Sequence, residues 1–546
     1  MFRSLLVAAL AAAAALAQAP PADPPPGSIA GVVRNAVTRA PLEGVRVQAG
    51  GADSVTTNSL GQFAISEVEP GRQWVSASDD RRAASGGVYV LVSSKREASG
   101  VEIFLKLGGA ISGKLLDENG NPVSGASILL LEPRFEFGEL VYSARLTVST
   151  GKDGAYRLEP VPAEQGFLIL ARNPLTALRP ADEIAADPRR RPRVPVPTYY
   201  PSSRLGREAE TVRLAPGEMR QDAGIRMGSA PPYCIGGKLD APEDAALSAV
   251  MIDEARSLAL GVKFKPATAM TAAEGRFRAC GIPPGEYQLS AVDASGQHAP
   301  FVYAFAPVSI VDRDLHDVRL EARAPAPIPG AVSWEPPPRD KSADPRALVM
   351  LIRYIADGNY ADDPKSPSPQ AVMVGMGDRV QVPGPFKLDG VPPDDYRLDV
   401  SDLPPGCYVK EASYGGADVR SGIVRLTKVE GPLRLGLACD GGFLTARVSD
   451  RDGNPVSQAH LCLMPADAAS EAALSKDIQC ADVDKGWSSI TQPLAPGKYL
   501  AIASEVNFDG AAQPLIKLWR ARSKAKPVEI GPNATVQLTL ELVEVN

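Results

Sequence analysis

The stretch ISGKLL at residues 111–116, followed by NGNPVSGA at residues 119–126, decides the fold class of this chain. Ile111, Gly113 and Leu115 recur with a period of two, which is typical of a half-buried β-strand. Asn-Gly accepts positive φ at low cost and marks a tight turn. An apolar run at residues 128–131 then begins another strand. The stretch therefore predicts two consecutive strands joined by a turn.

Working outward, the same opening strand recurs along the chain, which indicates an internal repeat. The other copies are Ile29-x-Gly31-x-Val33, Ile235-x-Gly237-x-Leu239, Ile328-x-Gly330-x-Val332 and Leu444-x-Ala446-x-Val448. The turn returns as DGNPVSQA at residues 452–459 and more loosely at residues 39–45. A small central residue in a strand predicts close approach of a neighbouring backbone or bulky side chain. The copies are spaced by roughly 80–125 residues, which is one β-sandwich per unit.

Each unit also closes with a recurring element, a Pro/Gly turn followed by an aromatic strand. Examples are PPGEY at 283–287, PPDDY at 392–396, APGKY at 495–499 and the variant EPGRQW at 69–74. Residues alternate after the turn, as in Tyr287, Leu289 and Ala291. We expect the aromatic side chain to fill the core between two sheets.

These patterns predict an all-β fold, a tandem array of about five immunoglobulin- or transthyretin-like β-sandwich domains. The 49 Gly and 51 Pro residues suit short strands with many turns, and 44% apolar residues suffice for cores. Long amphipathic helices are not evident, although the alanine-rich stretches at 241–249 and 466–475 are compatible with a helical turn or two. The expected boundaries are 27–107, 108–228 with a Pro- and Arg-rich insertion, 229–323, 324–429 and 430–546.

The repeated motifs resemble the carboxypeptidase regulatory-like domain, a transthyretin-like sandwich grouped with carbohydrate-binding-like folds. The matching elements are the Ile-x-Gly-x-Val opening, the Gly-Asn-Pro-Val-x-Gly-Ala turn and the Pro-Pro-Gly-x-Tyr closing, and residues 108–174 match best. The resemblance implies a fold, carries no catalytic residues, and implies exported bacterial proteins in which such domains stand in tandem. The zinc catalytic domain that accompanies this domain in metallocarboxypeptidases is not evident in the sequence.

The N-terminal residues 1–17 are predicted to be a signal peptide. Arg3 provides a positive charge, Leu5 to Leu16 is apolar, and Ala15-Leu16-Ala17 offers a small-x-small cleavage pattern. The alternative is a membrane anchor, but the run is shorter than the ~20 residues that a span needs. Residues 18–26 are expected to be a Pro-rich spacer, and no later segment is predicted to cross a membrane. We therefore expect an extracytoplasmic protein that is periplasmic, cell-surface or secreted.

An even number of cysteines in an exported chain suggests disulfides. They fall into three pairs of sequence neighbours, so we predict 234–280, 407–439 and 462–480, from Cys234, Cys280, Cys407, Cys439, Cys462 and Cys480. Six cysteines allow 15 connectivities, and buried free thiols are the alternative.

No catalytic, metal or cofactor site is predicted. The three histidines, His298, His316 and His460, stand in no zinc-binding frame, and no nucleophile-elbow, P-loop or dinucleotide motif is present. The alternating oxygens that start at Asp117 and Asp450 could form a loose calcium loop, but an Asx-Gly turn is the plainer interpretation.

Exposed basic and aromatic residues are the remaining binding candidates. The run 189–193 (RRRPR) is interpreted as a solvated loop, and the net charge of −6 predicts no nucleic-acid partner. Tyr199 and Tyr200 could stack on a sugar face, the alternative being that they pack against their own domain. Trp334, Trp487 and Trp519 are expected to pack in the same way.

The function predicted from sequence is that of a non-enzymatic, exported, multi-domain binding or structural protein of the cell envelope. Its partner would be a polysaccharide, a peptide or another envelope protein, and carbohydrate is favoured through the family resemblance alone. The alternatives are a glycoside hydrolase that uses paired carboxylates and an accessory subunit of an envelope secretion or uptake system.

Overall fold

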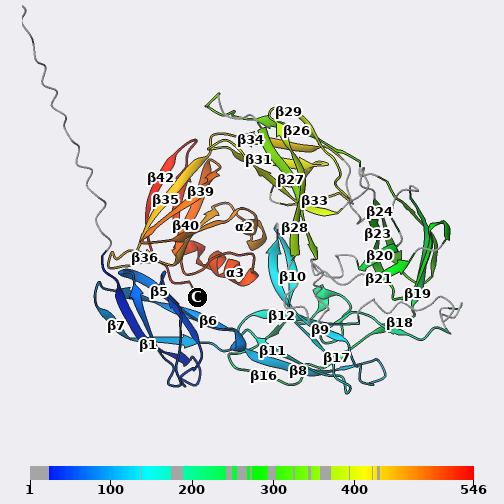
Figure 1. Cartoon of the computed structure of the whole chain (residues 1–546), viewed down its shortest axis with the longest axis horizontal. Coiled ribbons are helices and arrows are strands. Elements are labelled where there is room, and N and C mark those ends of the chain that lie inside the picture. The colour runs from blue at the N-terminus through cyan, green and yellow to red at the C-terminus, as the bar shows by residue number, and fades with distance from the viewer. Residues whose placement is uncertain are drawn as a thin grey trace, which may run out of the picture.

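The computed structural model (Figure 1) describes residues 24–545 apart from 137, 174–186, 188–189, 242–246, 248, 255–266, 271–272, 293–302, 324–325, 342–345, 357–370, 393, 421 and 427–430. The predicted signal peptide and His298 lie outside the described residues. β-Strands dominate, and the α-helices within the described part are the short α2 (Glu471–Asp477) and α3 (Ala512–Ala521). The predicted all-β, multi-domain fold is confirmed.

The first sandwich shows a topology that all five units share. Sheet I has the order fourth, first, seventh strand, and sheet II has the order third, second, fifth, sixth. The first and seventh strands run parallel, and the first and fourth antiparallel. Sheet I consists of β4 (Gln62–Val68), β1 (Gly27–Asn35) and β7 (Glu97–Leu105). Sheet II consists of β3 (Val55–Thr56), β2 (Arg46–Ala49), β5 (Gly71–Asp79) and β6 (Ala84–Val92), with η1 (Asp80–Arg82) between the last two.

The second sandwich keeps this plan, but its insertion splits the sixth strand into two pieces. Sheet I holds β11 (Ala155–Val161), β8 (Gly109–Leu116) and a divided last strand, β16 (Met219–Arg220) and β17 (Ile225–Arg226). Sheet II holds β10 (Glu139–Ser149), β9 (Ser127–Glu136) and β12 (Gly166–Arg172), with β14 (Thr198–Tyr199) and β15 (Val212–Arg213) both beside β12. Smaller elements are β13 (Val194–Pro195), which pairs with β18 (Ser229–Ala230), and η4 (Gly206–Glu208).

The third and fourth sandwiches repeat the same order. The third has β22 (Arg276–Ile282), β19 (Tyr233–Asp240) and β25 (Leu315–Glu321) against β21 (Ala267–Met270), β20 (Ala249–Glu254), β23 (Gly285–Val292) and β24 (Tyr303–Ile310), with η5 (Ala273–Gly275). The fourth has β29 (Gly384–Leu388), β26 (Ile328–Trp334), β34 (Leu433–Ala438), β31 (Tyr408–Tyr414) and β32 (Ala417–Asp418) against β28 (Ala371–Gln381), β27 (Arg346–Ala356), β30 (Asp395–Ser401) and β33 (Ile423–Arg425).

The fifth sandwich adds the two helices to the common plan. Sheet I contains β39 (Trp487–Leu494), β35 (Gly442–Ser449) and β42 (Thr535–Glu541), and sheet II contains β38 (Gln479–Val483), β37 (Ala459–Pro465), β40 (Gly497–Ser504) and β41 (Lys526–Ile530). Two further elements are β36 (Val456–Ser457) and η6 (Arg522–Lys524). Helix α3 was not anticipated from the sequence, although its buried residues Ala512, Leu515, Leu518 and Ala521 follow a helical spacing.

Each sandwich encloses its own apolar core, built from both of its sheets. In the first, Ile29 and Val33 of β1 and Ile103 of β7 meet Val47 and Val75 of sheet II. Corresponding clusters fill the other four units. Because β34 pairs with β26, we propose that the fourth domain extends through Ala438, rather than ending at residue 429 as expected from the sequence.

The central glycine of the opening strand permits close packing in the first four sandwiches, whereas the fifth has Ala446 at this position. A Cβ on Gly113 would stand 1.9 Å from the Ala223 carbonyl oxygen, and one on Gly237 would stand 1.9 Å from that of Val318. A Cβ on Gly330 would instead collide with the Phe386 ring at 2.2 Å. The expectation of close backbone or aromatic approach is therefore confirmed at these positions.

The closing turn is fixed by a tyrosine hydroxyl that bonds back across it. Tyr287 donates to the carbonyl of Pro283 at 2.8 Å, and Tyr396 donates to that of Pro392 at 2.7 Å. Tyr499 does the same in the fifth sandwich, with Ala495 as acceptor at 2.7 Å. In these three sandwiches the tyrosine ring fills apolar space while its hydroxyl satisfies a turn carbonyl.

The five sandwiches are arranged around a ring, with sheet I towards the outside and sheet II, α2 and α3 towards the inside (Figure 1). The ring closes where β36 of the fifth sandwich pairs with β5 of the first, in the register Val456–Arg72 and Ser457–Gln73. We call this contact the 1–5 joint. The β9–β10 hairpin of the second sandwich also meets the fifth, where the Phe135 amide donates to the Gly510 carbonyl at 2.8 Å.

Candidate functional site

The structure joins the six cysteines in three disulfides, Cys234–Cys280, Cys407–Cys439 and Cys462–Cys480. These are the pairs of sequence neighbours expected above. Cys234 lies opposite Cys280 in adjacent strands, and Cys462 lies opposite Cys480 in the same way.

Tyr199 and Tyr200 do not form an exposed stacking pair. Tyr199 is 2% exposed and packs with Leu129, Leu168 and neighbours on sheet II, whereas Tyr200 is 7% exposed and lies in the core of the second sandwich. Burial raises the pKa of Tyr199. The sugar-stacking interpretation is therefore wrong for these two residues, because β14 pairs with β12 and turns both side chains into apolar surroundings.

The tryptophans divide between packed and exposed positions. Trp334 and Trp519 are partly buried against neighbouring cores, and the Trp334 indole donates to the Val382 carbonyl at 3.2 Å. Trp487 is 54% exposed. The expected packing is therefore seen for the first two and not for Trp487.

The basic run at residues 189–193 is not a wholly solvated loop. Arg191 is buried, and its guanidinium bonds to both carboxylate oxygens of Asp314 in the third sandwich, at 2.6 and 2.7 Å. It also donates to the Pro232 carbonyl at 2.9 Å. The hydrogen bond from Arg191 is the main cause that lowers the pKa of Asp314. The insertion therefore attaches the second sandwich to the third through a bidentate ion pair.

The Asp450 loop uses its carboxylate internally. Asp450 accepts the backbone amides of Asp452 and Asn454 at 3.0 and 2.8 Å and the Asn454 side chain, and it pairs with Arg72 at 3.5 Å. Asp117 accepts equivalent bonds in the second sandwich. Both loops are Asx turns, and no group of three or more metal-ligating side chains occurs among the described residues.

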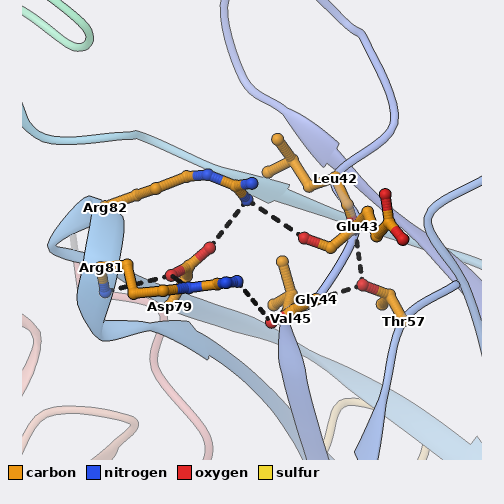
Figure 2. Close-up of polar contacts among 8 residues, drawn as sticks. All are labelled: Leu42, Glu43, Gly44, Val45, Thr57, Asp79, Arg81 and Arg82. Carbon is orange, nitrogen blue, oxygen red and sulfur yellow. Dashed lines mark hydrogen bonds and ion pairs between the residues drawn. The ribbon is translucent and has the colours of Figure 1, made fainter. Parts of the chain in front are cut away.

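A buried carboxylate at the end of the first sandwich serves a structural purpose (Figure 2). Asp79 caps η1 by accepting the Arg81 amide at 3.1 Å, and it binds the Arg82 guanidinium at 2.7 Å. The two arginines continue to the carbonyls of Gly44 and Glu43, at 3.2 and 3.3 Å. The hydrogen-bonding capacity of this cluster is directed at the protein itself, so it fixes a turn.

Thr57 provides a second polar bridge in the same region (Figure 2). Its hydroxyl donates to the Leu42 carbonyl at 2.6 Å and accepts the Val45 amide at 2.9 Å. Thr150 makes the same two bonds in the second sandwich. This threonine recurs in two of the sandwiches. It could not be recognised from the sequence, because a single residue in each unit forms no motif.

The best candidate for ligand binding is a groove of about 1320 Å³ between the fourth and fifth sandwiches, which we call the 4–5 groove. The fourth sandwich contributes the segments 399–401 and 403–409 and Arg420. The fifth contributes Phe443 and the segments 465–467, 476–479, 491–493 and 495–499. Grooves between domains are common ligand sites.

Three aromatic side chains line the 4–5 groove and are only partly buried: Tyr408, Phe443 and Tyr499. The Tyr408 hydroxyl donates to Asp440 at 3.1 Å, which fixes its ring. Burial raises the pKa of Tyr408 and of Tyr499, so both hydroxyls stay neutral at physiological pH. The groove therefore offers apolar ring faces beside neutral hydroxyls.

Charged residues of both signs accompany these rings. Arg420 of the fourth sandwich pairs with Asp477 at the end of α2, at 3.0 Å. Lys476, Lys498 and Asp467 are exposed on the fifth-sandwich side. The Cys407–Cys439 disulfide lies directly before Tyr408 and Asp440, and holds the segments that carry them together. The lining of the groove is therefore both polar and aromatic.

Among the described residues, no helix has the length and apolar character needed to cross a membrane. No family model matches the chain. No curated protein is similar to it at a significant level.

Several solved structures are similar to the chain at low sequence identity. A streptococcal ancillary pilin is 14% identical, with 55% of this chain and 99% of that chain covered and a TM-score of 0.21. The Bacillus anthracis TIE protein is 10% identical over 92% of this chain and 75% of that one, at a TM-score of 0.15. The shaft pilin SpaA of Lactobacillus rhamnosus GG is 12% identical over 38% and 98%, at 0.20.

Proposed function

We propose that this chain is an exported, non-enzymatic structural and binding protein of the cell envelope, and that it binds a polysaccharide in the 4–5 groove. The observation that carries the proposal is the gathering of Tyr408, Phe443 and Tyr499 in one groove between two sandwiches. Aromatic ring faces suit the apolar faces of sugars.

Export is supported by the covalent chemistry of the chain. All six cysteines are paired in disulfides, and disulfides persist in oxidising compartments. The predicted signal peptide agrees with this location. We further propose that the five domains are of the carboxypeptidase regulatory-like type, supported by the shared strand order and the repeated opening, turn and closing motifs.

A non-enzymatic role is supported by the ion pair of Asp477, which lines the groove together with Asp399 and Asp467. Asp477 is held by Arg420, which places a cation beside this carboxylate. A glycoside hydrolase needs one carboxylic acid and one carboxylate facing the same bond. If the chain hydrolysed a bound glycan, its function would be catalysis and not binding alone.

Binding is tested with the purified exported chain on a panel of bacterial and plant polysaccharides, followed by isothermal titration. We expect Tyr408→Ala and Tyr499→Ala each to weaken binding by about two- to tenfold, from the loss of one aromatic contact. Trp487→Ala is the matched control, because this exposed aromatic lies outside the groove and should leave affinity unchanged.

Tyr499→Phe separates the ring from the hydroxyl, since it keeps the stacking face and removes the bond to Ala495. We expect it to bind like the native chain. Failure of every polysaccharide to bind, or equal losses in the groove variants and in Trp487→Ala, would refute the groove. Release of reducing ends from a bound glycan would instead establish the hydrolase alternative.

A further inference from the structure

The 1–5 joint is built from two different surfaces contributed by the two ends of the chain. The Arg72 amide donates to the Pro455 carbonyl at 2.7 Å, and the Gln458 side chain donates to the Gly50 carbonyl at 3.0 Å. The groups in the latter bond are 408 residues apart in sequence. Nothing in this geometry requires that both surfaces belong to the same chain.

Two ion pairs make the joint electrostatically complementary. Arg72 of the first sandwich faces Asp450 of the fifth at 3.5 Å, and Glu69 faces Lys485 at 3.1 Å. Each sandwich therefore contributes one positive and one negative side chain to the contact. This arrangement fixes the register of the contact and disfavours other pairings.

Opening the joint leaves both sides unsatisfied. The edge of β5 at Arg72 and Gln73 loses the backbone partner that β36 supplies, and unpaired strand edges are templates for pairing. Tyr89 of β6, which packs against the core of the fifth sandwich, loses that apolar contact. An open chain thus carries one vacant strand position and one unpaired strand that fit each other.

A short hinge separates the first sandwich from the rest. Strand β7 ends at Leu105 and β8 begins at Gly109. The hinge is held by the Gly108 amide on the Arg82 carbonyl at 2.7 Å and by an exposed pair of Lys106 with Glu164 at 2.7 Å. Moving the first sandwich about this hinge leaves the contact between Phe135 and Gly510 in place, because that contact joins the second and fifth sandwiches.

We propose that the first sandwich exchanges between two copies of this chain, so that β5 of each copy pairs with β36 of the other in a closed dimer. The two joints of the dimer repeat every contact of the single-chain joint, which is the condition for low-cost domain exchange. The single-chain ring dominates in dilute solution, because its two surfaces are present at high effective concentration, and the dimer gains as protein concentration rises.

A pair of charge-reversed chains tests the exchange. Glu69→Lys and Lys485→Glu each place like charges across their own joint. When the two variants are mixed, briefly opened in mild denaturant without reductant and returned to buffer, both joints of the mixed dimer regain opposite charges. We expect the mixture to contain on the order of tenfold more dimer than either variant alone, since two exposed ion pairs change from repulsive to attractive.

Native mass spectrometry with tags of different mass distinguishes mixed dimers from dimers of one variant. The chain carrying both substitutions is the control for folding, because its own joint regains a Lys–Glu pair, and it should close into a monomer like the native chain. Equal amounts of mixed and single-variant dimer would overturn the proposal, as would a native chain that stays monomeric at the highest soluble concentration after the same treatment.

Discussion

Arg172 of the second sandwich binds Glu254 of the third, with 2.7 Å between the guanidinium nitrogen Nη2 and the carboxylate oxygen Oε1 and both side chains almost completely buried. The pair lies at the junction of two sandwiches, where neither charged group is exposed to solvent. Burying one of these charges without the other is costly, because no solvent remains to stabilise it. This pair therefore fixes the position of the third sandwich on the second.

Breaking this pair from one side is expected to be severe. Arg172→Met should lower the free energy of unfolding by about 3–5 kcal/mol, because it leaves the Glu254 carboxylate buried without its cation. The double variant Arg172→Met with Glu254→Leu should recover much of the loss. Denaturant unfolding of the three proteins checks this, and a double variant as unstable as the single one would contradict it.

The Arg191–Asp314 pair predicts an acid-sensitive contribution to stability. The pKa of Asp314 is lowered in the folded chain, chiefly by the hydrogen bond from Arg191. A depressed folded-state pKa gives stability that is fully present above the unfolded value of about 3.9 and is lost as pH falls through the folded value. Asp314→Asn should be less stable at pH 7 and should lose less stability on acidification, as followed by thermal melts across pH.

Glu505, whose charge acts on Tyr89 at the 1–5 joint, predicts the opposite trend. Burial raises the pKa of its carboxyl group, and the Val545 amide donates to its Oε1 at 3.1 Å. A carboxyl whose folded-state pKa is raised opposes folding once it ionises, so stability falls as pH rises from the unfolded pKa of about 4.3 through the folded value. Glu505→Gln should therefore be more stable than the native chain at pH 7 and not below pH 4.

The central glycine of the opening strand predicts a position-specific cost. Gly113→Ala should destabilise the second sandwich by about 1–3 kcal/mol, because its Cβ meets the Ala223 carbonyl oxygen and the strands must move apart. Ala446 occupies the equivalent position of the fifth sandwich, so Ala446→Gly serves as the reciprocal variant and should open space without a clash. Hydrogen exchange resolved by peptide would locate each effect, and an unchanged second sandwich in Gly113→Ala would contradict the prediction.

The Cys407–Cys439 disulfide predicts a link between stability and groove shape. Cys407→Ser with Cys439→Ser should cost about 2–4 kcal/mol, as is typical of a native disulfide. It should also weaken glycan binding, since the segments that carry Tyr408 and Asp440 are no longer tied together. Cys234→Ser with Cys280→Ser is the matched control, because that disulfide lies in the third sandwich, away from the groove.

Local patterns made the strands and the disulfides predictable. Ile111, Gly113 and Leu115 alternate because one face of β8 is buried, and such a period is visible in any single segment. Cys234 and Cys280 could be paired as sequence neighbours because they stand opposite each other in adjacent strands. The Asx turn at Asp450 was likewise readable from the residues of the turn itself.

Features that depend on contact between distant segments could not be predicted. The sequence predicts a solvated loop around Arg191. Its burial could not be predicted, because its partner Asp314 is 123 residues away. The sequence leaves open whether Tyr199 stacks on a sugar or packs against its own domain, because nothing in the insertion shows that it returns to β12. Helix α3 begins without a side-chain cap at Ala511, so no start signal marked it. The 4–5 groove arises only when two sandwiches meet.

The closure of the ring also decides how the protein responds to mechanical load. The first described strand, β1, and the last, β42, belong to the two sandwiches that β5 and β36 hold together. Tension applied between the ends of the chain therefore acts first on the 1–5 joint, while the linkers between successive sandwiches carry no load. Once this joint parts, the first sandwich can move away about its hinge, and the contact between Phe135 and Gly510 must break before the other sandwiches separate. Extensible length is therefore released before any core has to unfold.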